Sequence, residues 1–151
     1  MWFMNKILNP LVILILRSPL HALMSTSLLL ITCCGRKTGK TYTLPVQYAQ
    51  AGNSIYIVPG MPEKKTWWRN LKEDSTVQLT LRGRNLPGNS HLLRPDTDSS
   101  EILKGFGAYI QRFPALVKVH RIRTENGGNL NLEDLSRAAM QAVILRVELQ
   151  K

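Results

Sequence analysis

Apolar and polar side chains alternate along several short segments of the chain, which is the pattern of half-buried β-strands. The C-terminal run is the clearest case, with apolar residues at 143, 145, 147 and 149 and charged residues at 146 and 148. Turn residues such as Gly83 and the Ala51-Gly52-Asn53 run separate the segments. The pattern predicts six strands, at 27–34, 41–50, 54–58, 77–81, 86–93 and 143–149. Because the first three are joined by short turns, we expect them to be antiparallel.

Other segments repeat their apolar residues at helical spacing. The spacing predicts helices at 99–112, which Pro114 follows, at 132–140 and, more briefly, at 63–73. Six antiparallel strands interrupted by helices favour an α+β single domain built on a small closed or split antiparallel β-barrel, not a parallel α/β sheet. We expect an N-terminal apolar helical segment at 1–26 and the barrel at 27–151, as one domain overall.

The N-terminal segment is strongly apolar but interrupted by Pro10, Arg17 and Pro19. The uninterrupted pieces are shorter than the roughly 20 residues that cross a bilayer, and no small-residue cleavage site follows them. Asn9-Pro10 and Ser18-Pro19 each combine a capping residue with a proline, which is typical of helix starts. Two interpretations remain open. The helices cover an open end of the core, or they lie on a membrane surface with Trp2, Phe3, Lys6 and Arg17.

The chain carries a formal charge of +10, from 20 Lys and Arg against 10 Asp and Glu. Such an excess favours anionic partners. It is concentrated in Gly35-Arg36-Lys37-Thr38-Gly39-Lys40-Thr41, a run with three cations and two glycines. A nucleoside triphosphate loop is excluded, because that motif needs a glycine where Cys34 stands and a helix where a strand follows. An anion-binding loop and a solvated basic hairpin remain.

A second informative stretch contains the pair Trp67-Trp68, close to Lys64, Lys65 and Arg69. Neighbouring side chains on a helix point about 100° apart. We therefore expect Trp67 to pack in the core and Trp68 to stack on a flat ligand whose anionic part the cations hold.

These motifs occur in an order that resembles a known family. Gly35-Arg36-Lys37-Thr38-Gly39-Lys40, then Leu44-Pro45 and Tyr48, then Trp67-Trp68-Arg69-Asn70-Leu71 is similar to the pattern of the deazaflavin-dependent nitroreductases. The resemblance implies a split β-barrel. It also implies an oxidoreductase that passes hydride from the reduced deazaflavin coenzyme F420 to a quinone, a nitroaromatic or another small electron-poor acceptor.

The resemblance also implies which residues bind the coenzyme. The tail would lie against the basic loop, and the ring system against the next two strands and the tryptophan segment. The positions are Arg36, Lys37, Thr38, Gly39, Lys40, Leu44, Pro45, Val58, Pro59, Gly60, Trp68 and Arg69. No acid, base, nucleophile or metal ligand is assigned, because the cofactor carries the chemistry. The chain departs from the family in having Pro59-Gly60-Met61-Pro62-Glu63-Lys64-Lys65 where many members are glycine-rich, which leaves FMN as an alternative cofactor.

The partners expected are a small-molecule acceptor, a second copy of the chain and a membrane surface that the N-terminal helices contact. Nucleic acid is not expected, because base stacking needs exposed aromatic side chains and only Trp68 is a persuasive candidate. The expected location is the cytoplasm, at the inner face of the cell membrane. Two other functions remain as alternatives: an FMN-dependent oxidoreductase of the same barrel type, and a non-enzymatic lipid-binding protein.

Overall fold

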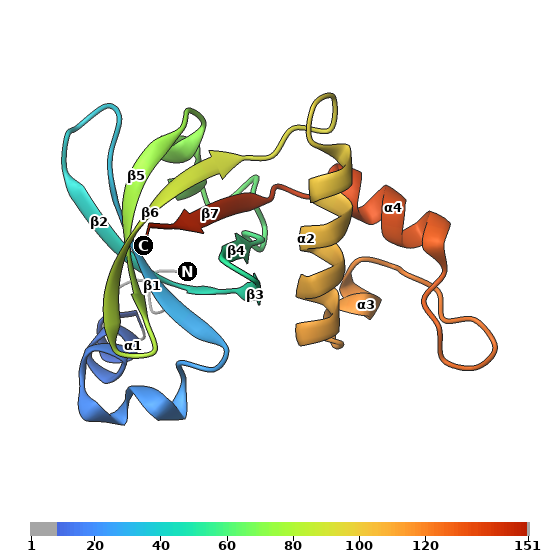
Figure 1. Cartoon of the computed structure of the whole chain (residues 1–151), viewed down its shortest axis with the longest axis horizontal. Coiled ribbons are helices and arrows are strands. Elements are labelled where there is room, and N and C mark those ends of the chain that lie inside the picture. The colour runs from blue at the N-terminus through green and yellow to red at the C-terminus, as the bar shows by residue number, and fades with distance from the viewer. Residues whose placement is uncertain (1–8, 151) are drawn as a thin grey trace.

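One antiparallel sheet of seven strands forms the body of the protein in a computed structural model that describes residues 9–150 (Figure 1). The strands lie in the order β2-β1-β5-β6-β7-β4-β3. Their bounds are β1 Leu28–Cys34, β2 Thr41–Gln47, β3 Ala49–Ala51, β4 Ser54–Ile57, β5 Ser75–Leu81, β6 Arg84–Leu92 and β7 Leu145–Leu149. The antiparallel arrangement and the single domain agree with the expectation from the sequence.

The sheet curls into a half-barrel, and its two edge strands are consecutive in the chain. Only Tyr48 separates β2 from β3, although these strands pair with β1 and β4 at opposite edges. The Tyr48 hydroxyl donates to the Ser25 carbonyl at 2.8 Å, and the Tyr48 N–H donates to the Ser27 carbonyl at 3.4 Å. The prediction of one strand over 41–50, and hence of six strands, was therefore wrong. At Tyr48 the chain passes from pairing with β1 to pairing with β4.

The concave side of the sheet holds the main core. It is made by inward side chains that include Leu29, Ile31, Ile55, Leu79, Leu145 and Val147. Leu30 is also fully buried, although it points to the opposite face of β1, against which helix α1 packs. Strand β1 is thus buried on both faces, which explains its nearly continuous apolar sequence.

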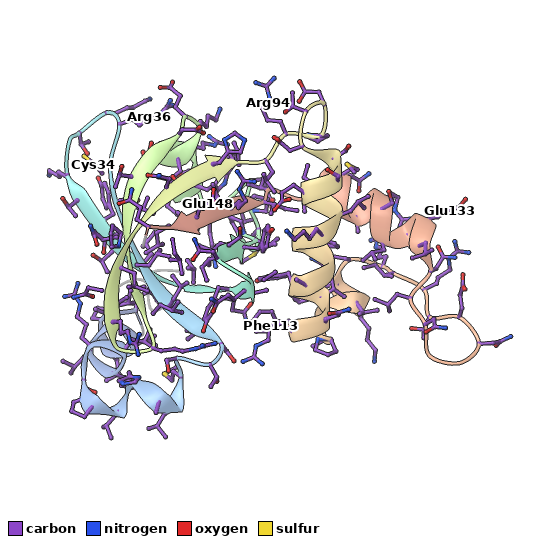
Figure 2. The ribbon with its side chains drawn as sticks, viewed as in Figure 1. Cys34, Arg36, Arg94, Phe113, Glu133 and Glu148 are labelled. Carbon is purple, nitrogen blue, oxygen red and sulfur yellow. The ribbon has the colours of Figure 1, made fainter. Side chains whose placement is uncertain are left out.

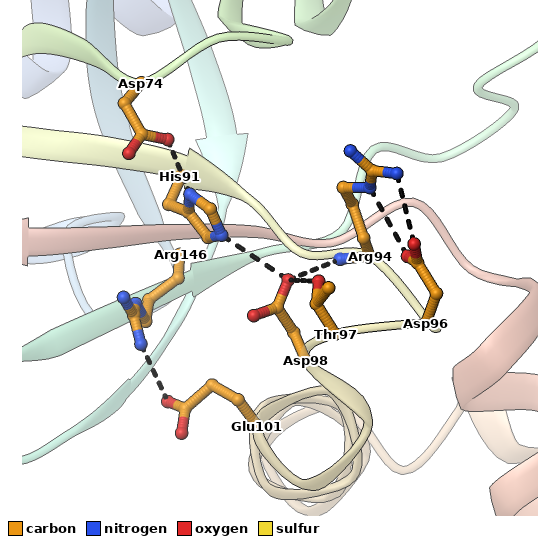
Figure 3. A network of polar contacts seen from close by, with 8 residues as sticks. All are labelled: Asp74, His91, Arg94, Asp96, Thr97, Asp98, Glu101 and Arg146. Atoms are coloured by element: carbon orange, nitrogen blue, oxygen red, sulfur yellow. Dashed lines mark hydrogen bonds and ion pairs between the residues drawn. The ribbon is translucent and has the colours of Figure 1, made fainter.

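Helices α2 (Ser99–Arg112), α3 (Leu116–Val119) and α4 (Leu132–Gln141) form a group on one side of the sheet (Figure 1). A second apolar cluster lies beneath α2 and α4, and includes Tyr56, Ile102, Phe106, Ala139 and Ile144. At the start of α2, Asp98 lies within reach of His91 on β6, which also contacts Asp74 (Figure 3). The predicted bounds of α2 are confirmed. Helix α3 was not predicted, because four residues are too few to show a helical period.

The N-terminal helices are α1 (Asn9–Arg17) and the 3₁₀ helix η2 (Pro19–Leu23). The Ser18 hydroxyl accepts a hydrogen bond from the Leu20 N–H at 3.1 Å, so the predicted cap is confirmed. Trp2, Phe3 and Lys6, to which the sequence assigned a membrane role, lie outside the described residues. None of the helices within 9–150 is both long and apolar enough to cross a membrane.

The helix predicted at 63–73 is wrong in type and length. Only Trp67–Leu71 is helical, as the 3₁₀ helix η3. The residues before it form a turn, in which the Lys64 and Lys65 N–H groups donate to the Met61 carbonyl at 3.0 and 2.9 Å. Met61, where this turn begins, has a φ of 51°, which is a left-handed conformation.

Candidate functional site

The basic run forms the loop of the β1–β2 hairpin. The Gly35 N–H donates to the Lys40 carbonyl and the Gly39 N–H donates to the Gly35 carbonyl, each at 2.8 Å. Gly39 has a φ of 65°, which favours glycine. Gly35 is required for a different reason, because a Cβ there would lie 2.6 Å from the Tyr42 ring. These bonds tighten the loop and leave the cationic side chains on its outside.

The loop is attached to the tryptophan segment. The Arg36 N–H donates to Asn70 Oδ1 at 3.3 Å, and the Arg36 guanidinium lies 3.4 Å from Glu73 Oε1. Figure 2 shows Arg36 on the hairpin at the end of the sheet far from Phe113. Lys37 and Lys40 are exposed, and within 9–150 neither forms an ion pair. Two unpaired cations therefore stand beside η3, available to an anionic ligand.

A cavity of about 710 Å³ opens next to η3, between β2 and the segment that follows β4. We call it the ring cavity. Of the residues predicted from the sequence, five lie on its wall: Leu44, Pro45, Val58, Pro59 and Gly60. Lys64 and Lys65 also line it and give it positive charge. Apolar walls with a few placed polar groups are typical of small-molecule sites.

Both tryptophans pack against the main core, as was expected for Trp67 but not for Trp68. Trp67 lines the ring cavity. The indole N–H of Trp68 donates to the Pro62 carbonyl at 3.0 Å, and the Arg69 guanidinium lies 5.6 Å from the centre of the Trp68 ring. Trp68 and Arg69 are not on the cavity wall. The expectation rested on a regular helix, whereas the short 3₁₀ turn rotates Trp67 to the cavity.

Sequence reasoning missed Tyr109 and Gln47, which lie at the far end of the ring cavity. The Tyr109 hydroxyl lies 3.3 Å from Gln47 Oε1 and 3.4 Å from the Val58 carbonyl oxygen. Burial raises the pKa of Tyr109 to about 12, so its hydroxyl remains a donor at physiological pH. A tyrosine among the apolar positions of a helix was the available signal, since a buried hydroxyl requires a partner.

A second cavity of about 440 Å³ continues beyond Tyr109 and Gln47 towards α3 and α4. We call it the side cavity. It shares with the ring cavity the turn Val58-Pro59-Gly60-Met61. Two compartments with a common wall can hold two flat molecules near each other, which a transfer reaction between them requires.

Comparisons with known proteins identify the family and the fold. The family model described as F420H(2)-dependent quinone reductase matches residues 19–110, which is more than half of the chain. No curated protein matches the sequence.

Solved structures share the fold at low identity. A structure of an F420-H2 dependent reductase has a TM-score of 0.56 and 16% identity, covering 81% of this chain and 94% of that one. A domain-swapped dimer has the same TM-score and identity, covering 81% and 80%. A putative 5-nitroimidazole antibiotic resistance protein from Bacteroides thetaiotaomicron has a TM-score of 0.50 and 8% identity, covering 87% and 78%.

Proposed function

This chain belongs to the F420H(2)-dependent quinone reductase family, and we propose that its ring cavity is where the deazaflavin ring binds. The chain is an oxidoreductase that uses the deazaflavin coenzyme F420, and the family assignment favours F420 over FMN. The observation that carries the proposal is the contact between Arg36 and Asn70. It attaches the loop that carries Lys37 and Lys40 to η3, and Trp67 at the start of η3 lines a cavity with an apolar wall.

The residues of the ring cavity fit a flat ring system. Leu44, Pro45 and Val58 provide apolar walls, and Trp67 provides an aromatic surface. Gly60 lines the cavity, is exposed and carries no side chain, and a Cβ there would meet no atom within 4 Å. A small residue beside a ligand lets backbone donors and acceptors approach it closely.

The residues around the ring cavity also fit an anionic tail. Lys64 and Lys65 stand on its wall, and Lys37 and Lys40 extend the positive charge past η3. In this proposal Arg36 has a positioning role as well, since its bonds to Asn70 and Glu73 hold the loop against η3. Thr38 and Gly39 complete the part of the loop carried over from the family. Trp68 and Arg69, which contact each other off the cavity wall, are left out of the proposed site.

The coenzyme supplies the reducing chemistry: a quinone gains a hydride from the reduced deazaflavin and a proton from solvent, and leaves as a quinol. The protein binds and orients the reactants and limits the access of water. The protonated Tyr109 hydroxyl fixes Gln47 and the Val58 carbonyl at the wall that both cavities share. We therefore expect Tyr109 to act by positioning that wall.

Fluorescence titration with the coenzyme tests whether the ring cavity, with Trp67 on its wall, binds the deazaflavin ring. Replacing Trp67 with alanine should weaken binding about tenfold, as loss of a stacking surface does. Trp68→Ala is the matched control, because it removes the same ring from the other side of η3 and should change affinity less than twofold. Equal losses in the two variants would contradict the assignment of Trp67 to the ring. Oxidation of the reduced coenzyme by a quinone is the companion assay for turnover.

For the architecture, we propose that the curled sheet is the split barrel expected from the sequence. One continuous stretch supplies both edge strands, β2 and β3, and bends at Tyr48. This arrangement joins the two edges through the chain itself.

We also propose that the N-terminal helices contact a membrane containing anionic lipid. Leu11 and Leu14 on α1 are 53% and 66% exposed, and Leu20 and Leu23 on η2 are 60% and 75% exposed. Arg17, the last residue of α1, is exposed as well. Exposed leucines beside a cation are typical of a helix that lies at a lipid surface.

Vesicle sedimentation tests the membrane contact. The full chain should sediment with phosphatidylglycerol vesicles, and Leu20→Ser with Leu23→Ser should reduce the bound fraction several-fold. Leu132→Ser is the control, because Leu132 is 77% exposed but lies on α4. Equal sedimentation of all variants would contradict the proposal.

Self-association is the remaining proposal about partners, and it rests on the likeness to a domain-swapped dimer. Light scattering after size exclusion should give twice the 17.1 kDa of one chain. A mass of one chain at micromolar concentration would contradict it.

A further inference from the structure

A third hollow adjoins the side cavity and shares part of its lining. This hollow has a volume of about 460 Å³ and lies between α3 and α4. We call it the arginine pocket, because Arg121, Arg123 and Arg137 line it. His120, Arg121 and Gln141 line both the side cavity and the arginine pocket. The ring cavity, the side cavity and the arginine pocket therefore adjoin one another in sequence.

The middle of this path is apolar. Leu116, Val119, Ala142 and Val143 line the side cavity. Val119 is 69% exposed, which is unusual for a valine at the end of a helix and marks the open side of the cavity. A flat apolar group that reached the shared turn at Pro59 and Gly60 would lie along this wall.

The far end of the path is cationic. Arg123 donates to Asp134 through Nε at 2.7 Å, and Arg137 donates to the same carboxylate through Nη1 at 2.7 Å. Asp134 is buried, and hydrogen bonds from Arg123 are the main reason that its pKa lies far below its usual range. One carboxylate therefore faces two guanidinium groups and remains ionised. Arg121 adds a third cation.

Of the arginines that line the side cavity and the arginine pocket, Arg121 is the one with no partner for its charge. Among the described residues no carboxylate forms an ion pair with it. Arg121 lines both the side cavity and the arginine pocket, whereas Arg123 and Arg137 line only the latter. It is thus the charge nearest the apolar wall.

The backbone at Arg121 is unusual. Arg121 follows α3 with a φ of 53°, where glycine is the favoured residue. The Ile122 N–H donates to the Val117 carbonyl at 3.0 Å, which is the bond pattern of a Schellman cap. Arg137 Nη2 donates to the Arg121 carbonyl at 3.1 Å and fixes the turn to α4. The chain therefore carries an arginine in an unfavourable conformation at the junction of the two hollows, which suggests a use for its side chain.

His120 lines both the apolar side cavity and the cationic arginine pocket. Its ring packs edge-on against Phe106, with centroids 5.1 Å apart. Burial lowers the pKa of His120, so the ring is neutral at physiological pH. His120 therefore adds no charge to the path, and Arg121 is the group that can select an anion.

We infer that the side cavity is the acceptor site and that Arg121 selects acceptors carrying an anionic group. The inference rests on the proposed function and extends it by naming the acceptor class: a flat quinone with a carboxylate or sulfonate substituent. The apolar part lies against the side cavity, with the anion at Arg121. The acceptor gains a hydride from the reduced deazaflavin and a proton from solvent, and is released as the quinol with its anionic group unchanged.

A matched pair of acceptors tests the inference. The probes are 1,4-naphthoquinone-2-sulfonate and neutral 1,4-naphthoquinone, each assayed with saturating reduced coenzyme. In Arg121→Gln, kcat/KM for the sulfonate should fall about tenfold, mainly through KM, as expected for loss of one charge-assisted contact. For the neutral quinone it should change less than twofold. The ratio of the two kcat/KM values is measured in each variant and compared between variants, which cancels the different intrinsic reactivities of the two quinones.

Arg82→Gln is the control variant. Like Arg121, Arg82 is an exposed arginine with a positive φ, of 49°, but it lies on the β5–β6 turn. Arg82→Gln therefore makes the same chemical change as Arg121→Gln, in a similar backbone conformation, at another place. It should leave both quinones within twofold of the unmodified protein.

Calorimetric titration of the sulfonate into the protein with oxidised coenzyme provides a second readout, in which no turnover occurs. Arg121→Gln should raise the Kd about tenfold there as well. Equal losses for the two quinones, or an unchanged Kd, would overturn the inference. Failure of the unmodified protein to bind the coenzyme or to reduce the neutral quinone would instead overturn the proposed function.

Discussion

The Tyr109 hydroxyl lies 3.3 Å from Gln47 Oε1, and this contact joins helix α2 to strand β2 at the point where the ring cavity meets the side cavity. The two residues are 62 positions apart in the sequence. Because Tyr109 is buried and Gln47 is exposed, the bond connects the interior of the protein to the cavity wall. The geometry of the shared wall therefore depends on the position of α2.

Replacing Tyr109 with phenylalanine should affect both stability and turnover. Loss of one buried hydroxyl that has partners typically costs about 1 kcal/mol of unfolding free energy. The freed Gln47 side chain should also lower kcat/KM several-fold, because the wall it fixes is shared by both cavities. Urea unfolding and the quinone assay measure the two effects separately.

Tyr48→Phe is the matched control for that variant. It removes a buried hydroxyl that donates to the Ser25 carbonyl at 2.8 Å, where the chain bends between β2 and β3. Its unfolding free energy should also fall by about 1 kcal/mol, with kcat/KM per folded molecule unchanged. If Tyr48→Phe lowered kcat/KM as much as Tyr109→Phe, the role of Tyr109 at the cavity would be wrong.

Gly105 is predicted to be essential for docking α2 on the sheet. A Cβ at Gly105 would overlap the Tyr56 ring, which is itself fully buried. Gly105→Ala should therefore push the helix from the sheet and cost about 1–3 kcal/mol, as overpacking does. Thermal or urea unfolding measures the loss.

Substitution of Gly107, two residues further along the same helix, should change the unfolding free energy in the opposite direction. A Cβ there meets no atom within 4 Å. Gly107→Ala should raise the unfolding free energy by about 0.5–1 kcal/mol, because alanine has the higher helix propensity. A loss of stability in both variants would mean that α2 does not pack as described.

His91 should make stability depend on pH. Its Nδ1 lies 2.5 Å from Asp74 Oδ1 and its Nε2 lies 3.4 Å from Asp98 Oδ2 (Figure 3). The hydrogen bond to Asp74, more than the contact with Asp98, raises the pKa of His91 above 6.5 in the folded protein. Its contribution is therefore fully present below about pH 6.5, and is lost as pH rises through the folded pKa.

The difference in unfolding free energy between the unmodified protein and His91→Gln isolates this effect. Taking the difference cancels His120, whose pKa burial shifts in the opposite direction. The difference should shrink steadily as the pH is raised from 6 towards 9. A difference that stayed constant or grew over that range would contradict the assigned contacts.

Local pattern predicted much of the fold. The helix at Ser99–Arg112 was predicted with its observed bounds, because a regular apolar period and a proline beyond its end leave little ambiguity. The Ser18-Pro19 helix start and the antiparallel strands followed from capping and alternation. These features depend on neighbours in the sequence, so the sequence alone contains them.

Features that depend on distant contacts were not predictable in the same way. The break in the strand at Tyr48 depends on bonds to Ser25 and Ser27, and the choice of Trp67 over Trp68 depends on the turn at Met61. The junction at Tyr109 arises only when α2 docks on the sheet. The family resemblance predicted the deazaflavin cofactor, but it did not predict the cavities that lead from the proposed ring site to Arg121.

The proposed role of the basic loop is tested most directly by one equilibrium titration. Fluorescence should report the Kd of F420 and of the same deazaflavin ring without its anionic tail. If the loop binds the tail, F420 should bind at least about tenfold more tightly than the tailless ring, and Lys37→Ala should weaken F420 several-fold without changing affinity for the tailless ring. Lys72→Ala, a control at an exposed lysine just after η3, should change neither affinity. Equal affinity of the unmodified protein for the two ligands would contradict the assignment of the loop.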